Sequence, residues 1–243
     1  MSQLPVIFKR ELGSYFATPL AYVFTLIFLV LSGVFTFYLG GFYERGQADL
    51  IPFFSFHTWL YLFLIPAIAM RLWSEERKSG SIELLMTLPI TRFEAVTGKF
   101  LAAWVFAGIA LLLTFPMVIT VNYLGQPDNG AIATGYFSSW LLAGAFLAIG
   151  SCMSALAKNQ VIAFILAVSV CFLFIVSGLP MVLDAFAWAP QWLVDAVASL
   201  SFLIRFDSLS KGVIDLRDLL YFVTLIIVWL MATAIVVDLK KAA

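Results

Sequence analysis

Few side chains in this 243-residue sequence could carry out chemistry. His57 is the single histidine, and Cys152 and Cys171 are the two cysteines. These three residues cannot form a zinc site by themselves. The sequence G-x-x-x-x-G-K-[ST] is absent, so the chain has no P-loop that could cradle ATP phosphates. We therefore predict no catalytic residue, no cofactor and no metal in this chain, and expect His57 to form an interfacial hydrogen bond rather than to act as a gate.

The composition is typical of a protein that lies in lipid. Apolar residues make up 63% of the chain and charged residues 12%, and the mean hydropathy is +1.04. A soluble domain usually has about 25% charged and 45–50% apolar residues. The 14 cationic and 14 acidic side chains give no net charge, so no basic surface for nucleic acid is expected.

Six apolar runs are long enough to cross a bilayer, which takes about 20 residues per helix. The runs are continuous rather than alternating, which favours helices over the strands of a β-barrel. We therefore predict an all-α integral membrane protein with a single transmembrane domain over residues 1–243. Its spans are Leu20–Gly40, Phe53–Met70, Phe100–Leu124, Gly135–Ala157, Gln160–Leu183 and Leu219–Val237.

The distribution of lysine and arginine predicts the orientation, because cytoplasmic segments carry more of both. One set of connecting segments and both termini hold ten cations: Lys9, Arg10, Arg71, Arg77, Lys78, Arg92, Lys99, Lys158, Lys240 and Lys241. The other set holds four: Arg45, Arg205, Lys211 and Arg217. Both termini and the loop 71–99 are therefore expected in the cytoplasm.

Residues 4–16 have the pattern of an amphipathic helix that precedes the first span. Lys9 and Arg10 fall away from the apolar stripe, where they can contact anionic headgroups. We predict a membrane-surface anchor; the alternative is a frayed tail. The stripe consists of Leu4, Phe8, Leu12 and Tyr15.

The loop 71–99 is predicted to contain a short helix between two breaks. Gly80 should end the helix that extends from the second span, Ser81 can cap a new helix, and Pro89 should end it. Thr91 and Glu94 form a capping-box pattern at the start of the next helix. The short helix either packs on the bundle or docks a partner. Its apolar face is Ile82, Leu85 and Met86.

Two further segments carry structural signals. Residues 183–218 contain aromatic side chains and apolar pieces too short to cross a bilayer, which suggests outer re-entrant or interfacial helices, with one helix over Gln191–Phe202. Asp215 is placed to cap the last span. On the fourth span, small residues at a spacing of four suit close helix packing: Gly144 with Ala148, and Gly150 with Ser154.

The segment MRLWSEERKSGSIELLMTLPIT, from Met70 to Thr91, resembles the first cytoplasmic loop of ABC transporter type-2 permeases. ELGSYFATPLAYVF, from Glu11 to Phe24, and YLGQPDNG, from Tyr123 to Gly130, are similar to the gliding-motility-associated, GldF-type branch. The resemblance implies an N-terminal elbow helix, six spans, a cytoplasmic coupling helix and outer re-entrant helices. It assigns the acids of the coupling region to Glu75, Glu76 and Glu83.

The resemblance also implies partners. Two copies of a separate ABC ATPase would bind ATP and Mg, and a second permease copy or a paralogous permease would complete the pathway, with a possible auxiliary periplasmic protein. We therefore expect a non-catalytic subunit of an exporter-type complex in the bacterial inner membrane. An alternative is a subunit that transmits force or assists assembly at an outer-surface partner, including maturation of a periplasmic metalloenzyme. The third hypothesis is an intramembrane enzyme, which is disfavoured because the sequence offers no catalytic groups within its spans.

Overall fold

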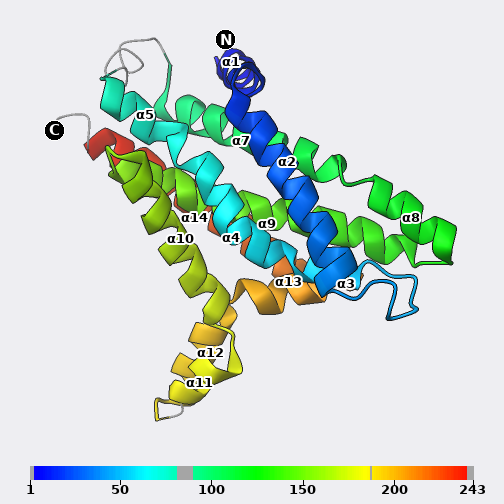
Figure 1. Ribbon diagram of the computed structural model, residues 1–243. Helices are drawn as coiled ribbons and strands as arrows, with labels where there is room; N and C mark the ends of the chain where they lie inside the picture. Colours follow the sequence, from blue (N-terminus) through cyan, green and yellow to red (C-terminus); the bar gives the residue numbers. More distant parts are fainter. Residues whose placement is uncertain (1–2, 81–89, 187, 240–243) are drawn as a thin grey trace.

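The computed structural model describes residues 3–80, 90–186 and 188–239, and every element in these ranges is helical (Figure 1). The elements are α1 (Leu4–Ala17), α2 (Pro19–Val34), the π-helical turn η1 (Phe35–Leu39), α3 (Ile51–Ser55), α4 (His57–Ala69), α5 (Arg71–Ser79), α7 (Arg92–Leu112), α8 (Pro116–Leu124), α9 (Asn129–Leu156), α10 (Gln160–Val176), α11 (Pro180–Ala185), α12 (Gln191–Ser199), α13 (Phe202–Ser210) and α14 (Leu216–Leu239).

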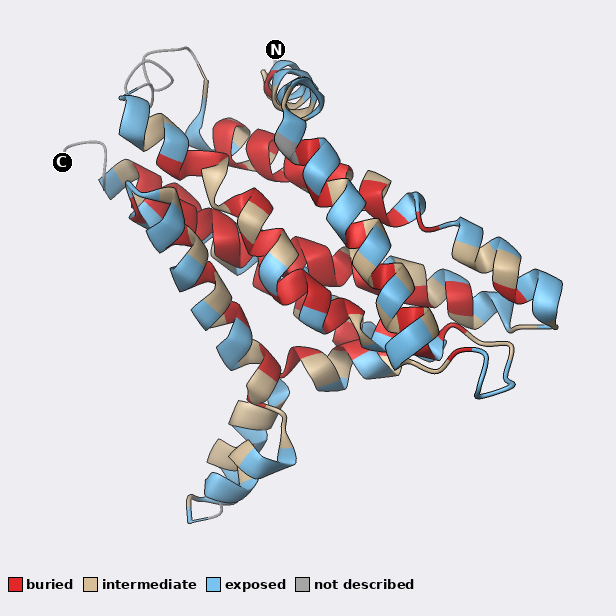
Figure 2. Ribbon diagram, in the orientation of Figure 1, coloured by how far each residue is buried: buried red, intermediate tan, exposed pale blue. Residues whose placement is uncertain are grey.

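Helix α9 is the centre of the bundle. It contacts α4, α5, α7, α10, α13 and α14, and Figure 2 shows it buried along most of its length. Asp128 caps its first turn by accepting hydrogen bonds from the N–H groups of Gly130 and Ala131. A helix surrounded in this way must be apolar on all sides, which explains why this run shows no amphipathic period.

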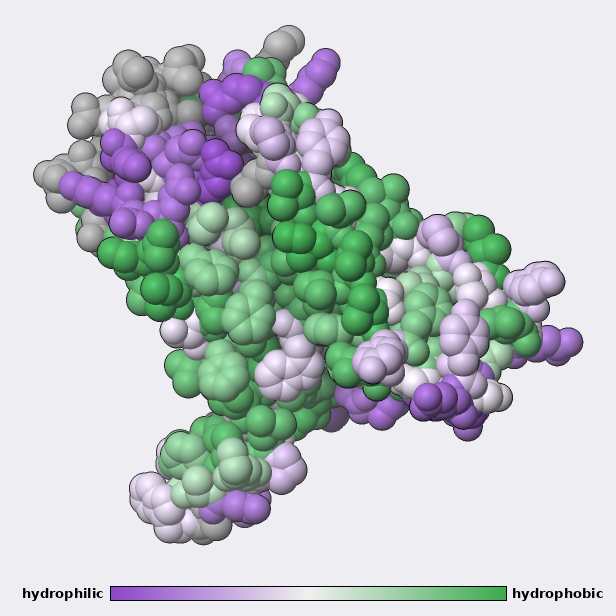
Figure 3. All heavy atoms as spheres, in the orientation of Figure 1, coloured by the Kyte–Doolittle hydropathy of each residue, from purple (hydrophilic) through white to green (hydrophobic). Residues whose placement is uncertain are grey.

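Four helices of the described chain are long and apolar enough to cross a membrane: Ala21–Leu39, Arg92–Leu124, Asn129–Leu156 and Leu216–Leu239. The other two predicted spans form shorter helices. The second run is divided into α3 and α4, and the fifth forms the 17-residue α10. Figure 3 shows hydrophobic residues over the middle of the visible face, between hydrophilic groups at its two ends.

The predicted breaks around the loop 71–99 are confirmed where the structure describes them. Gly80 follows the end of α5 with φ of +73°, a left-handed conformation that suits glycine at this position. Thr91 and Glu94 form the predicted capping box at the start of α7. The expected cap at Ser81, the helix after it and its end at Pro89 lie outside the described residues.

The helix expected over Gln191–Phe202 is present, but it ends three residues earlier than expected. Helix α12 ends at Ser199, and α13 begins at Phe202, where the Ser201 hydroxyl accepts the N–H of Ile204 at 3.4 Å. A serine whose hydroxyl can accept a backbone N–H of a new helix favours the start of that helix over continuation of the preceding one. Helices α11 and α12 form a hairpin that projects from the bundle (Figure 1) and contains no buried residue among those described.

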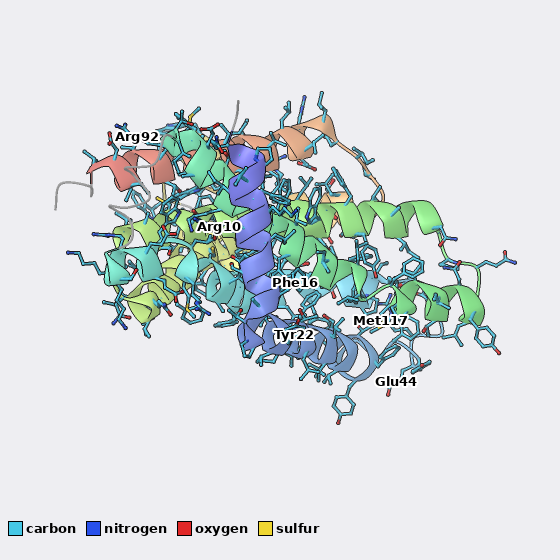
Figure 4. The ribbon with its side chains drawn as sticks, turned by 90° about the horizontal axis from the view of Figure 1, so that it is seen from above. Arg10, Phe16, Tyr22, Glu44, Arg92 and Met117 are labelled. Atoms are coloured by element: carbon cyan, nitrogen blue, oxygen red, sulfur yellow. The ribbon has the colours of Figure 1, made fainter. Side chains whose placement is uncertain are left out.

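Helix α1 confirms the helical pattern predicted for residues 4–16. Seen from above, it lies across the bundle and leads into α2, with Arg10 on α1 and Tyr22 just beyond the turn (Figure 4). Two of its apolar side chains pack on α7: Ile7, which is not part of the predicted stripe, contacts α7 at Gly98, and the ring of Tyr15, which is, stacks on that of Phe106 at 5.1 Å. Through Tyr15, the stripe therefore packs on α7, so it does not serve only to contact the membrane surface.

Candidate functional site

The end of the bundle that carries α1 and α5 holds most of the charge that the sequence assigns to one side of the membrane. Helix α5 continues from α4 after a break at Met70. Its C-terminal residue, Ser79, is followed by Gly80 and then by the segment 81–89, which lies outside the described residues. Helices α5 and α7 therefore stand on either side of that segment in the chain.

Helix α5 is attached to α9 by two serines. The Ser154 hydroxyl accepts the backbone N–H groups of Trp73 and Ser74 at 3.0 and 3.1 Å and donates to the carbonyl of Met70 at 2.8 Å. The first N–H groups of a helix have no partner within it, and Met70 gives α5 no side-chain cap. Ser154 of α9 therefore caps α5 from another helix.

Trp73 fixes the rotation of α5 against α9. Its ring is fully buried, and its ring N–H donates to the Ser151 hydroxyl at 3.1 Å. A buried tryptophan fills a large volume and satisfies its single polar group only in one orientation. Helix α5 therefore cannot rotate about its axis without breaking this hydrogen bond.

The small residues predicted for close packing lie in the interior of the bundle. A Cβ on Gly150 would be 2.4 Å from the Cβ of Ala69, and one on Gly144 would be 2.8 Å from Nε1 of Trp104. Ala148 is fully buried between them. The fourth predicted span thus approaches its neighbours within this chain at these positions.

The side chain of Lys99 on α7 contacts residues of two other helices, α5 and α1. Its ammonium lies 2.8 Å from Oε1 of Glu76 on α5 and 3.2 Å from Oε1 of Glu11 on α1, and 5.5 Å from the centroid of the Trp73 ring. The Lys99 side chain is only 4% exposed, and the two carboxylates are 15% and 18% exposed. We call Lys99, Glu11, Glu76 and Trp73 the Lys99 cluster.

Electrostatics within the cluster favour the ionised carboxylate. Burial alone would raise the pKa of Glu11, but the charges and hydrogen bonds of Lys99 and Arg10 outweigh it, and the pKa is lowered. Burial, together with the nearby Glu11 carboxylate, raises the pKa of Tyr15. A hollow of about 190 Å³ opens beside these groups between α1 and α5.

The residues predicted for this end occupy different environments. Glu75 is 51% exposed and pairs with Arg71 at 2.8 Å on the same helix; this hydrogen bond lowers the pKa of Glu75. Glu76 turns inward to Lys99. Lys9 and Arg10 are exposed on α1, as their positions off the stripe predict. The remaining predicted residues, Ile82, Glu83, Leu85 and Met86, lie outside the described residues.

Two more contacts close this end of the bundle. Arg77 of α5 donates to the carbonyls of Ala155 and Leu156 at 2.8 and 3.0 Å, and so caps the C-terminus of α9. Arg92 at the start of α7 pairs with Asp238 near the end of α14 at 2.8 Å. These contacts connect the segments on both sides of 81–89 to the long helices.

Sequence reasoning did not identify Glu11, Arg77 or Lys99 as contact residues. Lys99 and Arg77 entered only the count of cytoplasmic cations. The available signal was Glu11, a lone acid beside Lys9 and Arg10 on an otherwise apolar helix. A lone acid at such a position points to a cationic partner elsewhere in the fold, but not to which one.

The far end of the bundle contains the single histidine. His57 is fully buried at the start of α4, with Nδ1 2.8 Å from the Ser139 hydroxyl. Its ring packs among Phe28, Phe53 and Tyr61. Within residues 3–80, 90–186 and 188–239, no three His, Cys, Asp or Glu side chains are grouped so that they could hold a metal ion.

The comparisons with known proteins identify the family. The model of the ABC-2 family transporter proteins matches residues 6–239, which is nearly the whole chain. The chain belongs to the ABC-2 transporter family. A search of the curated proteins finds no significant match. This ABC-2 protein is thus the multi-pass membrane subunit of a transporter, and its family implies an ABC ATPase as partner.

Proposed function

We propose that this ABC-2 protein is the permease subunit of an exporter-type complex in the bacterial inner membrane, in which a separate ATPase hydrolyses ATP. The observation that carries the proposal is the attachment of α5 to three other helices beside the segment 81–89. Hydrogen bonds from Ser154 and Ser151 and ion pairs of Lys99 connect α5 to α9, α7 and α1. A push on 81–89 would therefore be transmitted to several membrane helices together.

The proposed topology has six spans, with both termini and residues 71–99 in the cytoplasm. The second span would consist of α3 and α4 and the fifth of α10, which adds two shorter helices to the four long ones. The excess of lysine and arginine at the α1 and α5 end supports this orientation. Cysteine labelling from either side of the membrane at Ser79 and Asp128 tests it, and labelling of Asp128→Cys from the cytoplasm alone would contradict it.

The coupling helix is proposed to lie within 81–89 and to dock on the ATPase. Ile82, Leu85 and Met86 would insert into a groove of that partner, while Glu75, Glu76 and Glu83 would meet cations at its edge. The structure describes two of these three acids. Glu75 is the more exposed of the two, whereas Glu76 is already paired with Lys99 of its own chain. Glu75 is therefore the better placed for a contact with another protein.

The complex is proposed to contain two ATPase subunits, which bind ATP and Mg, and two permease chains, either identical or paralogous. Lys9 and Arg10 on the exposed side of α1 would contact anionic lipid headgroups. The GldF-type branch remains the proposed position within the family, supported by the sequence similarity near Glu11–Phe24 and Tyr123–Gly130.

Co-purification of the ATPase with the permease tests the proposed function. A centrally buried apolar anchor typically costs about 2 kcal/mol or more when removed, whereas an edge charge costs about 1 kcal/mol or less. Leu85→Asp should therefore release or uncouple the ATPase, while the conservative Leu85→Met and the edge variant Glu83→Ala should retain it. Wild-type co-purification and ATP hydrolysis by Leu85→Asp would refute docking through this segment.

Reconstituted vesicles separate transport from force transmission. Solute movement that depends on ATP, with hydrolysis stimulated by the solute, supports an exporter. ATP hydrolysis that only rearranges a protein on the outer surface would instead show that the subunit transmits force and transports nothing.

A further inference from the structure

Helix α1 approaches α7 most closely beside Lys99. A Cβ on Gly98 would lie 2.8 Å from Cγ2 of Ile7, so no larger side chain fits at that crossing without displacing α1. Glu11 lies one helical turn beyond Ile7 on α1 and reaches the ammonium of Lys99. The close crossing and the ion pair thus hold the same part of α1 on α7.

The charges of the cluster depend on one another. Lys99 is almost completely buried between two carboxylates, and a buried ion that loses its partner is left uncompensated. Without the ammonium, Glu76 would lose the ion pair that joins α5 to α7, and Glu11 would keep only its pair with Arg10 of the same helix at 2.6 Å. Lys99 is therefore the charged group that joins α5 and α1 to α7, beside the apolar contacts that also hold these helices.

The cluster also reaches the central helix. The Trp73 ring, 5.5 Å below the Lys99 ammonium, is hydrogen-bonded to Ser151 of α9. By contrast, the Arg71–Glu75 pair joins two residues of α5 to each other and is exposed. Two adjacent acids on α5 therefore differ in kind: Glu76 connects helices, and Glu75 does not.

We propose that Lys99 is the positioning residue that makes α1, α5 and α7 move as one unit when the ATPase acts on the segment 81–89. The inference rests on the proposed function and deepens it, since it names the residue through which a force on α5 is shared with α1. Lys99 acts through the carboxylates of Glu11 and Glu76.

Spin-label distances in the permease alone test the cluster directly. Labels are attached at Gly13→Cys on α1 and Lys78→Cys on α5 in the full chain, with the two native cysteines replaced by alanine, in lipid nanodiscs. Both sites are exposed, and a Cβ at Gly13 meets nothing within 4 Å. We expect a single narrow distance distribution for the wild type and for Lys99→Arg, and loss of the single narrow peak for Lys99→Met.

Two glutamate variants provide a matched comparison that does not depend on the folding of Lys99→Met. Glu76→Gln removes the charge that α5 contributes to the cluster and should broaden the distribution, whereas Glu75→Gln, one residue earlier, should leave it unchanged. An unchanged distribution in Glu76→Gln, or equal broadening in Glu75→Gln, would overturn the proposal.

A second measurement uses the complex with its ATPase. If Lys99 positions the helices, Lys99→Met should keep the ATPase bound but separate its ATP hydrolysis from conformational change at α1, and Lys99→Arg should restore the link. Failure of the wild-type chain to bind an ATPase would refute the proposed function, while the distances in the isolated permease would still decide the role of Lys99. Wild-type coupling in Lys99→Met would refute the inference alone.

Discussion

Replacement of Ser154 by alanine removes the group that caps α5 from outside the helix. The substitution takes away one hydroxyl and leaves the helical backbone of α9 intact, because alanine is the best helix former. The N–H groups of Trp73 and Ser74 then lose their common acceptor, and the carbonyl of Met70 loses a donor. All three groups lie where α4 passes into α5; Trp73 and Ser74 are fully buried, whereas Met70 is partly exposed and its carbonyl keeps the hydroxyl of Ser74 as a donor.

The magnitude follows from the number of unmade hydrogen bonds. Loss of a helix cap costs about 0.5–2 kcal/mol, and a buried polar group left unsatisfied costs about 1–3 kcal/mol. Partial relaxation toward intrahelical partners lowers the sum, so we expect Ser154→Ala to reduce the free energy of unfolding by about 2 kcal/mol. For a chain of this length, that corresponds to a decrease of about 4–8 °C in the midpoint of thermal unfolding.

Thermal unfolding of the purified protein in detergent, followed by tryptophan fluorescence, is the assay. Ser199→Ala is the matched control, because that exposed hydroxyl donates only to the carbonyl of Ala196 in the described structure. Ser199→Ala should change the free energy of unfolding by less than about 0.5 kcal/mol, as is usual for surface substitutions. If Ser154→Ala and Ser199→Ala unfold at the same temperature, Ser154 does not cap α5, and the proposed attachment of α5 to α9 is refuted.

Two other predictions concern packing and charge. Gly150→Ala should destabilise the protein by about 1–3 kcal/mol, because its methyl group would lie 2.4 Å from the Cβ of Ala69. Gly13→Ala, in open space on a helix, should stabilise the protein by up to about 1 kcal/mol. The same thermal assay compares the two variants, and equal changes in stability would contradict the close packing at Gly150. Because the pKa of Glu11 is lowered in the folded protein, its carboxylate stabilises the folded state above pH 4.5, and this contribution is lost as the pH falls through the lowered pKa. The wild type should therefore lose more free energy of unfolding below pH 4.5 than Glu11→Gln does. Identical pH profiles of stability would show that the ion pair with Lys99 does not contribute.

The sequence was sufficient to predict the elements whose signals are local. The helix over residues 4–16, the break at Gly80 and the capping box at Thr91 each depend on side chains within one or two turns, and the structure contains all three. Each of the four long helices likewise overlaps one of the predicted apolar runs, because hydropathy over about 20 residues is itself a local property.

Contacts between helices could not be predicted in the same way. Lys99 and Glu76 are 23 positions apart, and Lys99 and Glu11 are 88 apart; no spacing rule connects them. The role of Ser154 was also hidden, because the small-residue pattern that includes it explains close packing but not the hydrogen bonds of its hydroxyl. The helix predicted over Gln191–Phe202 extends too far at its C-terminal end, because hydropathy does not register that Ser201 can cap the first turn of a new helix.

The position of α9 has a consequence for the order in which the protein can be assembled. α9 is enclosed partly by α14, which is synthesised 60 residues after α9 has ended. Until α14 enters the membrane, Gly144 of α9 has Trp104 of α7 beside it but lacks its second neighbour, Ile226 of α14. Of the six helices in the described part of the chain that pack on α9, α14 is the last along the chain, so the burial of the central helix is completed only when the final helix has been made.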